Sequence, residues 1–180
     1  SIEAIQTVGS VVLHGVAIKP GKPTILGMTM KDEQVIPLIG LPGYPVSGIL
    51  VLEQLIKPVL ALMSGRQVEA PEFVEATVSR RLVSSLKYLE FIRARLGKVG
   101  GRIVAVPLNR GAGVVSSFVK ADGIIHVPQN VEGYEAGEKV RVELLRPMKE
   151  IEQTLVITGS HDPLIDEVID IMRRTWTDSF

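Results

Sequence analysis

Lys19 and Lys22 have the side-chain type and the spacing to bind an anion. They flank a Pro-Gly pair in IKPGKP at 18–23, a pattern typical of the centre of a type II turn, in which Gly21 supplies a positive φ. Two ammonium groups at one end of a strand favour a dianion or a phosphate group. Lysines in turns are also often simply solvated, and the spacing by itself leaves that alternative open.

A second candidate for anion binding is LPGYPVSG at 41–48. It follows an apolar run, Gly43 allows the backbone to turn sharply, and Pro45 suits a first helical turn because its missing N–H needs no partner there. The free N–H groups of such a helix start, with Ser47 in the first turn, favour negative charge. A strand, a glycine turn and a helix often occur together, so this segment alone indicates only α/β architecture.

A third candidate is the segment from Phe91 to Ala121, which contains six Lys or Arg residues and neither Asp nor Glu. Arg93 and Arg95 share one face of their predicted strand with Phe91. The chain as a whole is neutral, so a local formal charge of +6 forms either an anion site or a solvated basic face. The six residues are Arg93, Arg95, Lys98, Arg102, Arg110 and Lys120.

RGAG at 110–113 precedes Ser116 and Ser117, which add two hydroxyl donors beside this charge. Glycine turns with serines are common in β-barrels, so the pattern is weak by itself. Together, an arginine fork, lysine ammonium groups and serine hydroxyls are the donors that a tetrahedral dianion needs.

The elements that must position these residues change along the chain. Residues 1–66 predict strands followed by a long helix over 45–64, which Pro58 should kink or divide and which Gly65 should cap in a left-handed conformation. The helix is apolar around most of its circumference and needs cover on several sides, more than the preceding strands can supply. We therefore expect that an upstream part of an α/β domain is missing. The predicted strands cover 11–18, 24–30 and 35–41.

Residues 68–148 show short alternating segments separated by Gly, Pro, Asn and Asp, a pattern typical of a small β-barrel or sandwich. In the first segment Phe73, Glu75 and Thr77 alternate with apolar residues, as in a half-buried strand. The predicted strands are PEFVEATVS, KYLEFIRARL, GRIVAVPL, VVSSFVKA, GIIHVP and EKVRVELL, at 71–79, 87–96, 101–108, 114–121, 123–128 and 138–145.

From Lys149 onward the pattern changes again. TLVITGS at 154–160 predicts a buried strand, and Asp162 and Pro163 predict the start of a helix that runs through Arg174. One β–α unit cannot bury both faces of a parallel strand, so we expect the opening of another α/β domain. The predicted fold is multidomain α/β plus all-β: a truncated α/β domain at 1–67, a small β-barrel at 68–148 and the first β–α unit of a further α/β domain at 149–180.

Composition argues against several classes of protein. The 20 Lys and Arg balance 20 Asp and Glu, which argues against a general nucleic-acid or membrane-surface binder. Without cysteine there are no disulfides or thiolate metal sites, which fits a reducing cytosol. His14, His126 and His161 are far apart and lack ligand spacing, so no metal site is predicted. Charged and polar residues interrupt the apolar run at 46–63, so no membrane span is predicted, and no signal peptide is visible.

Beyond these patterns, HGVAIKPGKP followed by GLPGYPVSG resembles the molybdopterin molybdenumtransferase family (MoeA type, also the gephyrin E domain). EFIRARL at 90–96, NRGAGVVSSFVKADGIIHVP at 109–128 and GYEAGEKVRVELL at 133–145 resemble that family's C-terminal β domain in order and spacing. ITGSHDPLIDEVIDIMRR at 157–174 resembles the start of the periplasmic-binding-protein-like domain fused to some members. One departure is Tyr44, where the family usually has Asn.

The resemblance implies a role in molybdenum cofactor biosynthesis, the insertion of molybdate into adenylated molybdopterin with release of AMP. Magnesium would assist, with ligands expected upstream of Ser1. A cytoplasmic homodimer that binds neither nucleic acid nor membranes is also implied. The implied catalytic residues around the oxyanion are Lys19, Lys22 and Arg93. The implied substrate-binding residues are Ser116 and Ser117 beside them, and Pro23, Gly43, Tyr44, Pro45 and Ser47 on the pterin and phosphate side.

Because the family's magnesium carboxylates and phosphate loop would precede Ser1, we expect this 180-residue chain to be inactive by itself. A second hypothesis is a non-catalytic oxyanion- or pterin-binding module, in which Tyr44 marks drift from catalysis. A third is a scaffold or sensor whose C-terminal unit binds a small ligand.

Overall fold

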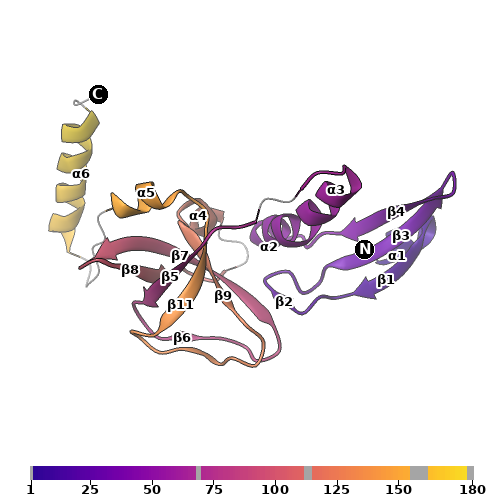
Figure 1. Ribbon diagram of the computed structural model, residues 1–180, viewed down its shortest axis with the longest axis horizontal. Helices are drawn as coiled ribbons and strands as arrows, with labels where there is room; N and C mark the ends of the chain where they lie inside the picture. The colour runs from indigo at the N-terminus through magenta and orange to yellow at the C-terminus, as the bar shows by residue number, and fades with distance from the viewer. Residues whose placement is uncertain (1, 68–69, 112–114, 155–161, 178–180) are drawn as a thin grey trace.

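The computed structural model describes residues 2–67, 70–111, 115–154 and 162–177. Figure 1 shows an elongated molecule in which a β-barrel and a three-stranded sheet lie on either side of two short helices, α2 (Pro45–Val51) and α3 (Lys57–Met63). The combination of an α/β unit with an all-β barrel confirms the predicted fold class.

The barrel consists of five strands that close on themselves. They are β5 (Phe73–Val78), β7 (Leu89–Val99), β8 (Arg102–Pro107), β9 (Gly123–Val127) and β11 (Lys139–Leu144). Their order is β7-β8-β5-β11-β9, and β9 pairs again with β7 to complete the ring. The alternation predicted for the first strand is confirmed, because Ala76 and Val78 of β5 are buried in the barrel core while Glu75 is exposed.

Short elements cover the ends of the barrel. β6 (Leu82–Val83) pairs with β10 (Gly133–Tyr134), and Leu82 belongs to the barrel core. The helix α5 (Met148–Glu152) packs on the barrel through Ile151, which is buried in the same core. The packing unit of the barrel therefore extends along the chain to Ile151.

The strand predicted at 114–121 is wrong. Residues Val115–Val119 form a helix, α4, and the Lys120 N–H donates to the Ser116 carbonyl at 3.1 Å. Phe118 of this helix packs against the hydrophobic cluster between α2 and the barrel. Valine-rich composition is a weak signal in so short a segment, because tertiary packing decides its conformation.

The small sheet contains β1 (Ser10–His14), β3 (Ile25–Lys31) and β4 (Gln34–Gly40) in the antiparallel order β1-β3-β4. The helix α1 (Ile2–Val8) contacts all three strands. The strands predicted at 24–30 and 35–41 are thus confirmed to within a residue.

The strand predicted at 11–18 is instead divided in two. After β1, Gly15 takes a φ of +89° and its N–H donates to the Thr24 carbonyl at 2.8 Å. The chain then leaves the small sheet, and β2 (Ile18–Lys19) pairs in parallel with β7 of the barrel. The break places Lys19 on the barrel edge, a result that hydrophobic periodicity alone does not reveal.

The helix predicted over 45–64 is present but interrupted. α2 is followed by a π-helical segment, η1 (Leu52–Ile56), and then by α3, with Pro58 in its first turn. The hydrogen-bonding pattern changes just before Pro58, in agreement with the predicted division. Gly65 has a φ of +65°, and the N–H groups of Gly65 and Arg66 bond back into the last turn at 3.2 and 2.9 Å. This is a Schellman cap, so the predicted left-handed cap is confirmed.

The long helix is covered mainly at its start. Val46, Leu50 and Val51 are buried in a cluster that joins α2 to the barrel. The end of the helix is exposed, with Leu62 at 77%. Pro45–Met63 is long and apolar enough to cross a membrane by length and composition, a test that core helices of soluble proteins also pass. The absence of a membrane span therefore stays a prediction. The remaining members of the buried cluster are Ile18, Phe91 and Ile124.

The C-terminal helix α6 (Pro163–Thr177) stands apart from the barrel (Figure 1). The Leu164 N–H donates to Asp162 Oδ1 at 2.9 Å, so the predicted acidic cap and proline start are confirmed. The predicted strand at 154–160 lies outside the described residues, apart from Thr154.

Candidate functional site

A gap in strand pairing on β7 brings two of the predicted cationic groups together. Glu90 pairs with both Lys19 of β2 and Val127 of β9, so β2 and β9 lie on opposite edges of β7. Ala94 likewise pairs with both β8 and β9, so β8 shares the edge that β2 uses. Phe91 and Ile92 therefore lie in a gap between β2 and β8, and the Arg93 carbonyl accepts a hydrogen bond from the Leu108 N–H, just after β8, at 2.8 Å.

A cavity of about 160 Å³ occupies this position. A single water needs about 10–15 Å³ of such space, so the cavity has room for a tetrahedral oxyanion. Three of the wall residues are cationic, and one is a buried carboxylate. The lining residues are Lys19, Pro20, Glu90, Phe91, Ile92, Arg93 and Arg110.

Arg93 is the most unusual of these residues, because its side chain is buried and only 3% of the residue is exposed. Its Nη2 donates to the carbonyls of Asn109 at 2.9 Å and Gly111 at 3.3 Å. Its Nε is buried and has no partner among the described residues. Burial lowers the pKa of the Arg93 guanidinium below its usual value. A buried donor without a partner is costly, so this atom is available for an anionic acceptor.

Glu90 is a site residue that the sequence reasoning missed. Its carboxylate is nearly fully buried, accepts a hydrogen bond from Ser84 Oγ at 2.7 Å, and lies 3.3 Å from Lys19 Nζ and 3.4 Å from Arg110 Nη1. Arg110 also donates to the carbonyl of Val83. The available signal was an acidic residue directly before a long cationic segment, where it can neutralise part of that charge.

Lys22 and Pro23 do not line the cavity. Both are exposed, and Lys22 Nζ lies 5.7 Å from the centroid of the Tyr88 ring, a cation–π arrangement. Gly21 has the predicted positive φ, at +129°, but the hydrogen-bonded turn joins Gly21 and Thr24 at 3.1 Å. The turn therefore closes two residues later than predicted, and the Lys19–Pro20 peptide bond is cis.

The helix start at α2 is only partly as predicted. Pro45 is the first residue of the helix and Ser47 is buried in its first turn, as expected. Tyr44 is the N-cap residue, but its side chain makes no capping hydrogen bond and is largely exposed. Gly43 lies just before the helix as expected, although its φ is not positive and a Cβ there would meet nothing within 4 Å.

Ser116 and Ser117 both lie on α4, which contacts α2. Ser117 is buried and Ser116 is exposed. Neither lines the cavity around Arg93. The structure therefore brings Lys19 and Arg93 together, with Arg110 and Glu90, while the other predicted ligands do not line this cavity.

The cationic segment is not a uniform solvated face. Arg95 Nε pairs with Asp122 at 2.7 Å, and Lys98 pairs with Glu152 at the same distance. Each pair joins residues distant in sequence, and the Asp122 carboxylate is buried whereas the Lys98–Glu152 pair is exposed. Among the six cations, Arg93 and Arg110 are the two that line the cavity.

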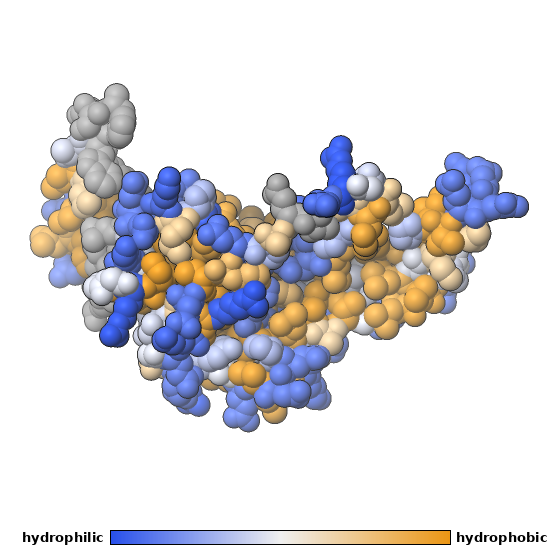
Figure 2. Space-filling view, in the orientation of Figure 1, coloured by the Kyte–Doolittle hydropathy of each residue, from blue (hydrophilic) through white to orange (hydrophobic). Residues whose placement is uncertain are grey.

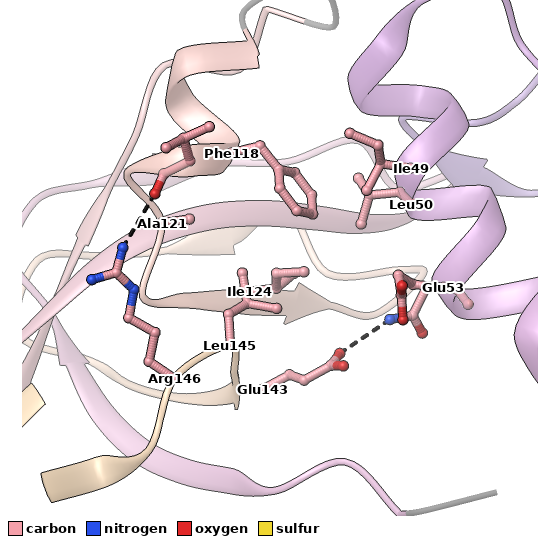
Figure 3. A pocket seen from close by; sticks show the side chains of 11 residues that line it. Ile49, Leu50, Glu53, Phe118, Ala121, Ile124, Glu143, Leu145 and Arg146 are labelled. Carbon is pink, nitrogen blue, oxygen red and sulfur yellow. Dashed lines mark hydrogen bonds between the residues drawn. The ribbon is translucent and has the colours of Figure 1, made fainter. Parts of the chain in front are cut away.

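A larger cavity of about 410 Å³ lies where α2 and η1 meet the barrel (Figure 3). The Phe118 ring points between Ile49 and Leu50 of α2 and Ile124 of β9 (Figure 3). Gln54 donates to Glu143 at 3.2 Å across the junction, and Arg146 donates to the Val119 carbonyl at 3.3 Å. These polar groups already have protein partners, so this cavity makes a weaker anion site than the one beside Arg93.

The Glu143 carboxylate links helix and barrel in a pH-dependent way. His126 Nε2 lies 2.7 Å from it, and this hydrogen bond lowers the pKa of Glu143 below its usual 4.5. A lowered carboxyl pKa contributes stability at neutral pH that is lost as the pH falls through the folded-state value. We expect Glu143→Gln to lower the free energy of unfolding by about 1 kcal/mol at pH 7. In urea titrations this difference should shrink below about pH 4.5.

Glu75→Gln is the control for this measurement, because Glu75 pairs with Lys139 on the exposed barrel surface. Its effect should stay below about 0.5 kcal/mol at either pH. A Glu143→Gln difference that is the same at pH 7 and at pH 4 would contradict the role of the His126 contact.

The fold and the site together define a class: an anion-binding protein in which an α/β unit is followed by a closed five-stranded barrel, with a cationic cavity where β2 meets the barrel. Residues 1–62 match the family described as "Probable molybdopterin binding domain", and residues 75–145 match "MoeA C-terminal region (domain IV)". Together these two matches span most of the chain. The chain belongs to the MoeA family.

Named relatives agree with this assignment. A molybdopterin biosynthesis protein of Methanocaldococcus jannaschii is 35% identical over 147 residues, 81% of this chain and 33% of the relative. A molybdopterin molybdenumtransferase of Haemophilus influenzae is 32% identical over 142 residues, 77% of this chain and 34% of the relative. The crystal structure of a MoeA protein from Pyrococcus horikosii aligns with a TM-score of 0.62 at 35% identity, covering 81% of this chain and 34% of that one. The chain thus spans about a third of the length of these relatives.

Proposed function

We propose that this chain supplies the oxyanion site of a molybdopterin molybdenumtransferase, which inserts molybdate into adenylated molybdopterin with release of AMP. The chief support is Arg93, a buried guanidinium whose Nε has no partner among the described residues, beside a cavity that Lys19 and Arg110 also line. Relatives named molybdopterin molybdenumtransferase support the reaction. Because the chain spans about a third of the length of these relatives, we propose the complete reaction only for the whole protein.

Molybdate is the substrate that these residues would hold. The Arg93 Nε–H and the Lys19 ammonium group donate charge-assisted hydrogen bonds to its oxygens, and Arg110 adds positive charge from the segment after β8. Their contribution to the reaction is to position the oxyanion and to lower its repulsion from the phosphates of the second substrate.

The pterin and phosphate side of the site is proposed at the start of α2, through Pro23, Gly43, Tyr44, Pro45 and Ser47. Lys22, Ser116 and Ser117 do not line the cavity, so they are proposed as ligands of the oxyanion only outside it. Two facts support this arrangement: α4 contacts α2, and β2 continues into the turn that carries Lys22.

Magnesium is expected from the family. Among the described residues, no three His, Asp or Glu side chains come together as metal ligands. We propose that the magnesium ligands lie in the part of the whole protein upstream of Ser1, and that the described residues bind and position the substrates.

The test is a crystal of this chain soaked in molybdate, with the metal located by anomalous scattering. We expect one molybdenum atom in the cavity that Lys19, Arg93 and Arg110 line, within reach of Arg93 Nε. Sulfate soaks control for a site that accepts any tetrahedral dianion. Molybdenum bound elsewhere, or an empty cavity at saturating molybdate, contradicts the proposal.

One observation favours the alternative of a non-catalytic oxyanion-binding module. Tyr44 stands where the family usually has Asn, and its exposed side chain caps nothing. A molybdenum-insertion assay of the whole protein separates the two functions, because both predict molybdate binding and only the enzyme predicts turnover.

The proposal includes a cytoplasmic homodimer. Its support is the hydrophobic surface that gathers over the small sheet and the α2–α3 helices (Figure 2). Light scattering that shows a clean monomer of the whole protein would count against it. Exposed apolar residues of this surface include Val12, Met30, Val35, Leu60 and Leu62.

A further inference from the structure

We infer that Glu90 is a built-in competitor of the oxyanion: its carboxylate occupies the same two cations that the anion needs, and so weakens anion binding enough to allow release. This inference rests on the oxyanion site proposed above. It assigns a role to Glu90, which is not one of the proposed oxyanion ligands.

The two oxygens of Glu90 have different partners. Oε2 accepts the hydrogen bond from Ser84 at 2.7 Å, which anchors the carboxylate. Oε1 faces both Lys19 Nζ at 3.3 Å and Arg110 Nη1 at 3.4 Å. Glu90 Oε1 therefore takes the position between the two cations that an oxygen of the bound oxyanion would otherwise occupy.

The contacts of Glu90 with the two cations are loose. Charge-assisted hydrogen bonds between nitrogen and carboxylate are usually about 2.7–2.9 Å long, and the nearby Arg95–Asp122 pair reaches 2.7 Å. Lys19 and Arg110 keep about half and more than a third of their side chains exposed, whereas Glu90 is buried. The cations can therefore turn toward an incoming anion while the carboxylate stays in place.

Charge supports the same conclusion. Lys19, Arg93 and Arg110 carry three formal positive charges and Glu90 one negative charge, which leaves a net charge of +2 around the cavity. A dianion balances this charge and is repelled by Glu90 at the same time. Tight binding of a substrate that must be passed on does not speed its transfer, so a weakened site suits this task.

The experiment compares Glu90→Gln with the unchanged 180-residue chain by titration calorimetry. The probes are molybdate, a tetrahedral dianion, and perrhenate, a tetrahedral monoanion. Removing one buried negative charge should tighten molybdate binding by about 10-fold. Electrostatic energy is proportional to ligand charge, so perrhenate should gain about the square root of that factor, or about 3-fold.

Glu75→Gln is the matched control, since it removes one exposed carboxylate of the same barrel and should leave both affinities unchanged. Glu90→Asp keeps the charge but shortens the side chain, and should tighten molybdate binding by a smaller factor. If circular dichroism shows that Glu90→Gln does not fold, the molybdate affinity of Glu90→Asp tests the inference instead.

Molybdate binding that is unchanged or weaker in the Glu90 variants overturns the inference and leaves the oxyanion site standing. Equal gains for both anions also overturn it, because competition for charge must discriminate between them. If neither the unchanged chain nor a variant binds either anion, the oxyanion site fails and the inference fails with it. If the Glu90→Gln variant binds molybdate and the unchanged chain does not, the result supports the inference that Glu90 competes with the oxyanion.

Discussion

Arg93→Ala is expected to weaken molybdate binding by about 100-fold. The change removes a buried, charge-assisted donor from the wall of the cavity, and hydrogen bonds to charged groups contribute about 1.5–3 kcal/mol each. Arg93→Lys keeps the charge but loses the planar fork, so we expect a loss of about 10-fold. Isothermal titration of the 180-residue chain with molybdate measures both changes.

Arg95→Ala is the control for this pair of variants. Arg95 lies on the same strand, but it pairs with Asp122 and does not line the cavity. Its affinity for molybdate should stay within about 2-fold of the unchanged chain. Because Arg93 also donates to the carbonyls of Asn109 and Gly111, each variant needs a folded circular dichroism spectrum. An Arg93→Ala protein that is folded and binds molybdate normally excludes Arg93 as a ligand.

Leu50→Ala is expected to lower the free energy of unfolding by about 3 kcal/mol, the largest stability effect that we predict. Leu50 is fully buried in the cluster between α2 and the barrel. Truncation leaves a cavity at the point where the two units are joined, and Ile18, the residue before Lys19, belongs to the same cluster. Molybdate binding should therefore weaken together with stability. Urea unfolding followed by circular dichroism measures the change.

Leu62→Ala makes the same chemical change on an exposed part of the same helix, where Leu62 is 77% exposed. Its effect on unfolding should stay within about 0.5 kcal/mol. Equal effects of the two substitutions would show that the cluster around Leu50 does not hold the helix to the barrel.

Local rules account for the parts of the fold that were predicted correctly. The alternation around Glu75 identifies a half-buried strand because side chains of a strand point to opposite faces in turn. Asp162 and Gly65 mark helix ends because capping needs only nearby backbone groups. Each of these signals depends on a few consecutive residues.

The wrong predictions have a different origin. Val115–Val119 has the composition of a strand but forms a helix that packs Phe118 at the junction. Gly15 divides an apolar run that reads as one strand, because its two halves pair in different sheets. In both cases a contact with a distant part of the chain decided the local conformation.

The sequence by itself determined the family and most of the elements, and it predicted Lys19 and Arg93 as anion ligands, because motifs and periodicity are local properties. Only the tertiary structure showed that Lys22 lies beside Tyr88, outside the cavity, and that Glu90 and Arg110 complete its walls. The physical reason is strand register: the pairing of Lys19 with Glu90 joins segments about 70 residues apart, and the gap on β7 lies between this pairing and the β7–β8 hairpin.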